Sequence, residues 1–343
     1  MAPRVSILVA TWNRARFLPD ALDSVLRQTM PDFEVIVSDN ASTDDTEALV
    51  RGYAERDSRV RYFRNDENVG ITRNFNLCYA RSSDTPYWVA LPSDDRWDPT
   101  YLERALAVME AEPDVALVHT DAFRTDANGS VINRWSDLWS AMPPPGRHQA
   151  LKELMRGCYI CFPTAFARRS MLENVYPRPA GELFDTAFSH TLDWNFYLNL
   201  LGRGAQLYYL DTPLAYFRKH DGAMTMPAHM VPRLREEIRV LDQSFAAVCP
   251  PELDHERRLA LQERAANLGF NLLGSDAADE AGVALETARQ AGHRRLDVMV
   301  AGAISSLPVS PTVRGRLWRV TYNTSTVVRG LRPPTSRTPV TAG

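Results

Sequence analysis

Short apolar and β-branched runs alternate with helical patterns through the first 120 residues of the chain. These runs lie at residues 5–10, 34–38, 60–63, 87–91 and 115–120, and each has the length and composition of a strand. Between them, apolar side chains recur every three or four residues, as on one face of an amphipathic helix. The alternation predicts an α/β fold, in which a mostly parallel, Rossmann-like sheet is flanked by helices.

Two acidic residues indicate where helices begin. Asp44 lies three residues before Glu47, which is the spacing of a capping box. The Asp98-Pro99 pair is typical of an N-cap residue followed by proline at the first helical position. We therefore expect Asp44 and Asp98 to cap the helices that follow them.

The pattern changes after residue 120. Residues 192–201 have helical spacing, residues 206–210 and 214–217 are typical of two strands, and the Pro-rich segment 143–146 indicates a loop. From about residue 231 to residue 305 the pattern is almost wholly helical. These changes predict a first domain over residues 1–225 with halves 1–120 and 121–225, a helical region over 226–305, and a Pro-containing, partly ordered tail over 306–343.

Polar side chains gather where the predicted strands end. The residues that follow the first four strands are Thr11, Asn13 and Arg14; then Asp39; then Asn68 and Gly70; then Asp94 and Asp95. The carboxyl ends of parallel strands meet at one edge of a sheet, and ligands bind beyond that edge. The sequence therefore predicts one binding site built from these loops.

The adjacent acids Asp94 and Asp95 follow a buried strand. Two neighbouring carboxylates repel each other unless a positive charge is near, and a divalent cation shared with a diphosphate supplies one. The alternative is a solvated turn ahead of the next helix. Taken alone, this pair of residues does not decide between the two.

Four segments together resemble the inverting glycosyltransferases of family 2, which have the GT-A fold. They are Val5 to Arg14, Val37 to Thr46, Asn68-Val-Gly70 with Asn74, and Leu91 to Asp95, in the family's order and at its spacings. The resemblance covers roughly residues 4–225. It implies transfer of a sugar from a nucleotide-diphosphate sugar to an acceptor hydroxyl, by a single displacement that inverts the anomeric centre.

The resemblance also implies a nucleotide pocket. Thr11, Asn13 and Arg14 are expected to line it, with Asn68 and Gly70 shaping the adjacent loop. Two charged residues, Asp39 and Arg73, are expected to complete the pocket.

Asp39 is expected to bind the base. A carboxylate only accepts hydrogen bonds, so it suits the imide of uracil or thymine, which favours UDP or dTDP. Arg73 is a candidate for the diphosphate, and an exposed helix arginine is the equally weighted alternative.

The implied cofactor is Mg²⁺ or Mn²⁺. By the resemblance, Asp95 is the direct metal ligand and Asp94 lies near the ribose and the metal shell. Pro92 stands where the family often has a further acid. The segment from Tyr216 to Thr225 resembles the family's aromatic-Arg-x-His element.

That segment supplies two further candidates. His220 is expected to be a metal ligand through a neutral imidazole nitrogen. Arg218 or Lys219 is expected to neutralise the leaving diphosphate.

Asp193 is the candidate catalytic base. It lies in the Thr191 to Leu198 segment, which resembles the family's acidic motif ahead of an amphipathic helix, with Leu192 where the family usually has glutamate. A base is needed because the acceptor oxygen must lose its proton as it attacks. The alternative without a catalytic role is an acidic residue that the helix dipole favours at the start of a helix. Asp185 is the second candidate for this role.

Composition excludes several other classes. The net charge is −3, which does not indicate a nucleic-acid-binding protein, and no apolar run approaches the roughly 20 residues of a membrane helix. We therefore expect a cytoplasmic protein. Cys158 and Cys161 have CxxC spacing without a partner pair, which favours buried thiols over a zinc site.

The sequence of the C-terminal third allows more than one kind of binding partner. Six arginines and no acidic residue follow Asp297, so the tail is a candidate for contact with an anionic membrane surface, and a solvated tail is the alternative. The helical region is a candidate for homodimer contacts, for binding an acceptor or for binding a protein partner. The acceptor itself, whether saccharide, lipid-linked or small molecule, is not specified by these patterns.

Two other functions compete with glycosyl transfer. A sugar-phosphate nucleotidyltransferase would have a Gly-rich, basic phosphate loop after the first strand, and Thr11-Trp-Asn-Arg14 does not supply one. A non-catalytic sugar-nucleotide-binding protein would bind the donor without turning it over. Asp95, Asp193 and His220 argue against this second alternative without removing it.

Overall fold

The computed structural model describes residues 2–272, 280–281 and 284–285. The chain forms two compact units. The first comprises Met1–His229 and Arg239–Arg257, and the second comprises Met230–Ile238 and Arg258–Gly343. All predicted site residues fall in the first unit, whereas the basic tail lies outside the described residues.

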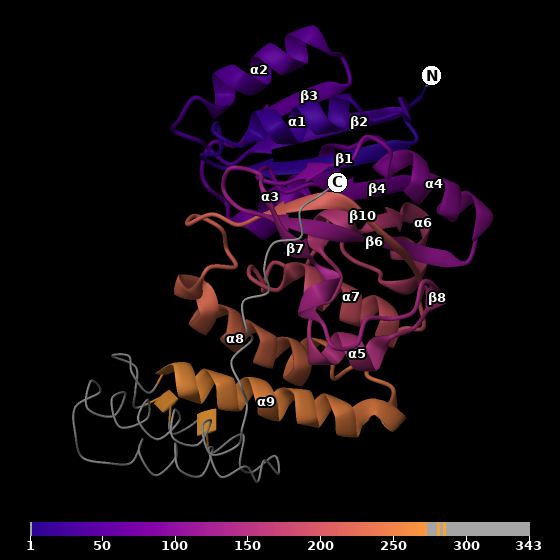
Figure 1. Cartoon of the computed structure of the whole chain (residues 1–343), viewed down its shortest axis with the longest axis vertical. Coiled ribbons are helices and arrows are strands. Elements are labelled where there is room, and N and C mark those ends of the chain that lie inside the picture. The colour runs from indigo at the N-terminus through magenta and orange to yellow at the C-terminus, as the bar shows by residue number, and fades with distance from the viewer. Residues whose placement is uncertain (1, 273–279, 282–283, 286–343) are drawn as a thin grey trace. The chain divides into compact units, whose positions relative to one another are not determined.

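The first half of the sheet is a parallel block (Figure 1). Its strands and helices are β1 (Val5–Thr11), α1 (Leu18–Leu26), β2 (Phe33–Asp39), α2 (Thr46–Arg56), β3 (Val60–Arg64), α3 (Ile71–Arg81) and β4 (Tyr87–Ala90). The strands lie in the order β3-β2-β1-β4, and every neighbouring pair is parallel. The register pairs Thr11 with Asp39 and Asp39 with Arg64, so these three strands end side by side.

The second half extends the same sheet. Its elements are β5 (Arg96–Trp97), α4 (Tyr101–Ala111), β6 (Val115–Thr125), β7 (Val131–Arg134), β8 (Gly146–His148), α5 (Leu151–Arg156), β9 (Phe166–Arg168), α6 (Arg169–Val175), α7 (Leu192–Gly202) and β10 (Gln206–Arg218). The full order is β3-β2-β1-β4-β9-β6-β10-β5, with β7 on β6 and β8 on β10. Single turns lie at Ser136–Leu138, Phe162–Thr164, Pro227–His229 and Pro251–Leu253, and a π-helical segment lies at Val240–Ser244.

The predicted fold class is confirmed: a central sheet flanked by helices. Beyond β4 the sheet is mixed, because β9 runs antiparallel to both β4 and β6. The pairing of β6 with β10 is parallel again.

Burial explains why β1 occupies the middle of the parallel block. Six of its seven residues are buried, so both faces of the strand are covered. Leu18, Leu22 and Val25 of α1 have no exposed surface and belong to the same core. Each fully buried leucine or valine stabilises the fold by about 1.5–3 kcal/mol relative to an exposed one.

Neither predicted helix cap forms as expected. Helix α2 begins at Thr46 rather than after Asp44, whose Oδ1 accepts the Thr46 N–H at 3.1 Å. Asp98 makes the same turn with the N–H of Thr100, at 2.9 Å, so α4 begins at Tyr101. Because Asp binds a backbone N–H two residues onward so readily, this local turn replaces the cap.

Residues 206–218 form one strand rather than two. The register of β10 against β6 shifts on both sides of Pro213, and this irregularity makes the sequence pattern look interrupted. Strand β6 extends to Thr125, beyond the predicted end at residue 120. The predicted helical region contains α8 (Met230–Arg239) and α9 (Asp254–Leu272), and most of its remainder lies outside the described residues.

Two further features bear on the expectations. Among the described residues, no helix is both long enough and apolar enough to cross a membrane. All four cysteines are free thiols, with Cys78 and Cys161 buried and Cys158 and Cys249 partly buried.

Candidate active site

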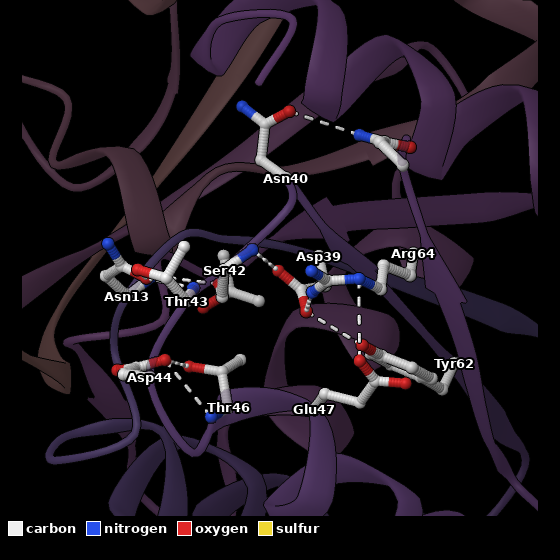
Figure 2. Close-up of polar contacts among 12 residues, drawn as sticks. Asn13, Asp39, Asn40, Ser42, Thr43, Asp44, Thr46, Glu47, Tyr62 and Arg64 are labelled. Atoms are coloured by element: carbon white, nitrogen blue, oxygen red, sulfur yellow. Dashed lines mark hydrogen bonds and ion pairs between the residues drawn. The ribbon is translucent and has the colours of Figure 1, made fainter. Parts of the chain in front are cut away.

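The loops after β1 and β2 are joined to each other. Asn13 has φ of +51°, a left-handed conformation that asparagine tolerates better than most residues. In this conformation its side-chain oxygen accepts the Thr43 N–H at 2.8 Å, and its backbone N–H donates to Ser42 Oγ at 2.9 Å (Figure 2). Thr11, at the end of β1, is buried, and its Oγ1 has no hydrogen-bond partner among the described residues.

Asp39 lies at the end of β2 with no exposed surface. Its Oδ1 accepts the Ser42 N–H at 2.9 Å, and its Oδ2 accepts the Tyr62 hydroxyl at 2.7 Å and Arg64 Nη1 at 3.0 Å (Figure 2). Burial and the hydrogen bond to Asp39 raise the pKa of Tyr62, so this hydroxyl stays protonated and donates. Arg64 Nε also lies 3.4 Å from Glu47 Oε2.

Asparagines order the loop between β3 and α3. Asn68 Oδ1 accepts Asn40 Nδ2 at 2.7 Å and the Gly70 N–H at 3.0 Å. Gly70 has φ of +83°, which a residue with a Cβ adopts only with strain. The predicted pair Asn68 and Gly70 thus lies beside the loop after β2. Arg73 is exposed and makes no hydrogen bond or ion pair with the described residues.

Asp95 is buried with one oxygen unsatisfied. Its Oδ1 accepts the Arg218 N–H at 2.8 Å, whereas Oδ2 has no partner among the described residues. Burial, and then the charge of neighbouring Asp94, raise the pKa of Asp95 well above its ordinary value. A cation placed at Oδ2 would relieve both effects.

His220 and Arg14 converge on Asp94. His220 Nε2 lies 2.9 Å from Asp94 Oδ2, and Arg14 Nε lies 3.7 Å from the same oxygen. His220 Nδ1 accepts the Gly222 N–H at 3.2 Å, and Arg14 Nη2 donates to the Gly222 carbonyl at 2.9 Å. These bonds assign the neutral His220 proton to Nε2, facing Asp94. The loops after β1, β4 and β10 therefore meet at one place.

The donor set fits a divalent cation. Asp95 Oδ2 is a carboxylate oxygen without a protein partner, and oxygen is the ligand that Mg²⁺ and Mn²⁺ prefer. Asp94 is its neighbour in sequence, and His220 contacts Asp94. Among the described residues, no three or more His, Cys, Asp or Glu side chains are grouped so that they could hold a metal ion by themselves. A donor diphosphate and water would have to supply the other ligands.

Arg218 is buried and bonded within the protein. Its guanidinium donates to the Asp94 carbonyl at 3.0 Å, the Ala127 carbonyl at 3.0 Å and Asp20 Oδ2 at 2.6 Å. These contacts fasten the end of β10 to the loop after β4, which is a structural role. Its contact with a diphosphate stays a prediction, and Lys219 is the exposed cation of the pair.

Asp193 lies in the first turn of α7 and is partly exposed. The Cys158 thiol contacts its Oδ2, with sulfur and oxygen 3.9 Å apart. Burial raises the pKa of the Cys161 thiol, and Asp95 and Asp193 are among the carboxylates that raise it further. Asp193 on α7 and Asp95 in the loop after β4 thus both act electrostatically on this thiol.

Asp185, the second candidate base, is placed differently. Its Oδ2 lies 3.7 Å from Arg178 Nη1, and its Oδ1 accepts the Ala187 N–H at 3.0 Å. Trp194, next to Asp193, is buried and donates its indole N–H to the Leu154 carbonyl at 2.7 Å, which anchors α7. The packing thus fixes the helix while leaving Asp193 partly open to solvent.

Sequence reasoning missed four residues of this site. Trp12 lies between Thr11 and Asn13 and is 49% exposed. A large aromatic residue in a loop directly after a strand is itself a sequence signal for a ligand-binding surface. Tyr62, Arg64 and Glu47 surround Asp39. Tyr62 and Arg64 are two residues apart on β3, hence on one face, but only the pairing of β3 with β2 brings them to Asp39.

Solved structures of similar fold include S. aureus TarS and a mannosyltransferase. Residues 1–349 of S. aureus TarS in complex with UDP superimpose with a TM-score of 0.63 at 17% identity, covering 94% of this chain and 92% of that one. The mannosyltransferase PcManGT from Pyrobaculum calidifontis, in complex with GDP-Man and Mn²⁺, gives 0.56 at 19% identity and covers 96% and 88%. At these identities the likeness establishes the GT-A fold.

Sequence comparison gives the family. The putative glycosyltransferase EpsH of Bacillus subtilis is 26% identical over 223 residues, which is 64% of this chain and 61% of EpsH. The chain spans as little as 24% of the length of another curated relative. The model of glycosyl transferase family 2 matches residues 6–176. Through these residues, the chain belongs to glycosyl transferase family 2.

Proposed function

We propose that the chain is an inverting glycosyltransferase that moves a sugar from a UDP- or dTDP-sugar to an acceptor hydroxyl. One observation carries the proposal. The buried, unpartnered Oδ2 of Asp95 lies in the loop where Asp94 meets His220 and Arg14. A buried carboxylate oxygen without a partner destabilises the folded protein. It suits a site that is completed by a cation and an anionic ligand.

The base would bind beyond β1 and β2. Asp39 is the acceptor for a pyrimidine imide N–H. Trp12 is half exposed and follows Thr11, the residue that pairs with Asp39, so it offers an aromatic face for the base. Asn13, Asn68 and Gly70 hold the surrounding loops. The TarS complexes with UDP and UDP-GlcNAc support a nucleotide-sugar donor in this fold.

The diphosphate would lie near Asp94 and Asp95. These carboxylates, with His220, would hold Mg²⁺ or Mn²⁺, which neutralises negative charge as a nucleoside diphosphate leaves. Arg14 reaches the same place from β1, and exposed Arg73 and Lys219 are further cations for the phosphates. Arg218 supports this site by fixing the loop after β4.

Asp193 would act on the acceptor. Its carboxylate takes the proton from the acceptor hydroxyl as that oxygen attacks the anomeric carbon, so the configuration inverts. Its partial exposure leaves room for a hydroxyl to approach. The Cys158 thiol orients Oδ2 from one side.

A donor screen tests the function. Thermal unfolding is measured with UDP-, dTDP- and GDP-sugars, each with Mn²⁺ and with EDTA, and binding raises the midpoint in proportion to ligand excess over Kd. We expect metal-dependent stabilisation by the uracil or thymine donors. Stabilisation by none of the three classes would contradict the proposal.

The base assignment has its own test. Asp193→Asn is expected to lower transfer at least 10³-fold while the donor shift persists, because the amide cannot take a proton. Asp185→Asn is the matched control and is expected to retain activity. Normal turnover by Asp193→Asn would assign the proton transfer elsewhere.

A further inference from the structure

The carboxylate proposed to bind the base is closed to solvent. Asp39 has no exposed surface, and three donors already occupy its oxygens: the Ser42 N–H, the Tyr62 hydroxyl and Arg64 Nη1. Because the carboxylate is fully buried behind these donors, a base N–H can reach it only if one of them withdraws. The following inference rests on the proposed function, in which Asp39 binds the base.

Two of the three donors are fixed. The Ser42 N–H belongs to a backbone held by Asn13, since Ser42 Oγ accepts the Asn13 N–H at 2.9 Å. The guanidinium of Arg51 lies over the ring of Tyr62, 5.2 Å from the ring centroid, and holds Tyr62 in place. Neither donor leaves Asp39 without dismantling the packing around it.

Arg64 is the donor that is able to leave. Its side chain is 35% exposed at the end of β3, and Figure 2 shows it between Asp39 and Glu47. Arg64 Nε lies 3.4 Å from Glu47 Oε2, whereas Arg51 uses the other oxygen, Oε1, at 2.8 Å. Glu47 thus has an oxygen available for Arg64 without displacing Arg51.

We propose that Arg64 is a positioning residue that gates Asp39, so that a base N–H binds this carboxylate only when Arg64 withdraws. In the free protein, Arg64 Nη1 occupies the place on Asp39 Oδ2 that the base N–H takes in the complex. When the nucleotide binds, the guanidinium moves fully onto Glu47. No covalent step is involved, since one hydrogen bond on Oδ2 is exchanged for another.

The gate defines which base is accepted. Withdrawal of Arg64 opens one place on Oδ2, while Tyr62 keeps the other and Oδ1, which accepts the Ser42 N–H, stays buried. A uracil or thymine imide offers one N–H, which matches one vacancy. The Watson–Crick edge of guanine offers two adjacent N–H groups and requires both carboxylate oxygens. The arrangement therefore favours a pyrimidine nucleotide.

Calorimetric titration of the full chain with UDP and with GDP, both with Mn²⁺, tests the gate. Arg64→Ala is expected to bind UDP about three- to tenfold more tightly, because the base no longer competes with a charge-assisted hydrogen bond. GDP is expected to gain less than UDP, because guanine needs both carboxylate oxygens and the substitution opens only one place on Oδ2. In turnover, KM for the donor falls while kcat is unchanged.

Two further variants fix the interpretation. Glu47→Gln removes the charge that receives Arg64, so UDP binding is expected to weaken by a similar factor. Arg61→Ala is the charge-matched control, because Arg61 is on the same strand but pairs with Glu34, at 2.8 Å. We expect its UDP affinity to stay within about twofold of the wild type.

The outcomes are distinguishable. Arg64→Ala binding UDP no better than Arg61→Ala, or Glu47→Gln binding as well as wild type, overturns the gate and leaves the proposed function standing. Failure of the wild-type chain to bind either nucleotide overturns both. The opposite signs expected for the two variants cannot arise from simple loss of stability, which would weaken both.

Discussion

His220 Nε2 lies 2.9 Å from Asp94 Oδ2, and the ring's other nitrogen accepts the Gly222 N–H. The imidazole thus links the loop after β10 to the acid pair after β4. Binding a cation through Nε2 requires the ring proton to move to Nδ1, which faces the Gly222 N–H. Either Gly222 shifts, or His220 keeps its proton and orients Asp94.

We expect His220→Ala to weaken metal-dependent donor binding about 10- to 100-fold, since both ligands and the residues that orient them have effects of this size. Mn²⁺ titration at fixed donor concentration measures the change. His229→Ala, which alters the next histidine along the chain, in the turn Pro227–His229, serves as the control. Unchanged Mn²⁺ affinity in His220→Ala would separate this ring from the metal.

Arg218→Met is expected to lower the free energy of unfolding by about 2–4 kcal/mol, because it leaves Asp20 and two carbonyl oxygens without their buried donor. Urea unfolding without any ligand measures this effect. Lys219→Met, one residue away and exposed, should change stability by less than about 0.5 kcal/mol. Equal stability of the two variants would argue against the structural role of Arg218.

The buried pair His119 and His148 makes the fold acid-sensitive. Their Nε2 atoms are 2.9 Å apart, and burial lowers the pKa of His148 to about 4 and that of His119 well below its ordinary value. Both rings are neutral in the folded protein, whereas in the unfolded chain they take up protons near pH 6.5. The stability they contribute is complete above pH 6.5 and is lost as pH falls toward 4.

For His148 alone the loss amounts to about 3 kcal/mol. Unfolding free energies at pH 7.5, 6 and 5 should fall steeply for the wild type and less steeply for His148→Phe. A wild-type stability independent of pH over this range would show that the pair is protonated or solvated in the native state.

Alkylation of Cys158 is expected to abolish transfer. The thiol is partly exposed and contacts Asp193 Oδ2, so a maleimide adduct would occupy the space of the acceptor hydroxyl. Donor-induced stabilisation should persist, because the nucleotide loops are untouched. Cys158→Ala should resist inactivation, and Cys249→Ser, which removes the other partly buried cysteine, should remain sensitive. Resistance of the wild-type enzyme would contradict the placement of Cys158 beside the base.

The parts of the site that follow buried strands were predictable from sequence. Asp39, Asp94 and Asp95 come directly after apolar runs, and parallel strands necessarily bring such residues to one edge. Their hydrogen-bond partners were not predictable. Arg64 reaches Asp39 only through the register of β3 on β2.

Contacts between residues far apart in the chain also limited what could be predicted from the sequence. The motif around Arg218 favours a phosphate ligand, but its guanidinium is already paired with Asp20 of α1, almost 200 positions away in the chain. The His119–His148 contact depends on the pairing of β8 with β10, and a three-residue strand such as β8 has too little periodicity to be recognised. Sequence patterns specify which groups lie at the strand ends, and tertiary packing decides which of them remain available to a ligand.

The position of β9 has a consequence for synthesis of the chain. This three-residue strand lies between β4 and β6, although both of those strands precede it in sequence. Until residue 168 has left the ribosome, β4 and β6 each present an unpaired edge, and β10 comes later still. Open edges are sites of improper pairing between chains. A nascent chain halted near residue 160 would therefore be a substrate for chaperones, whereas a chain extended past residue 218 has its complete sheet.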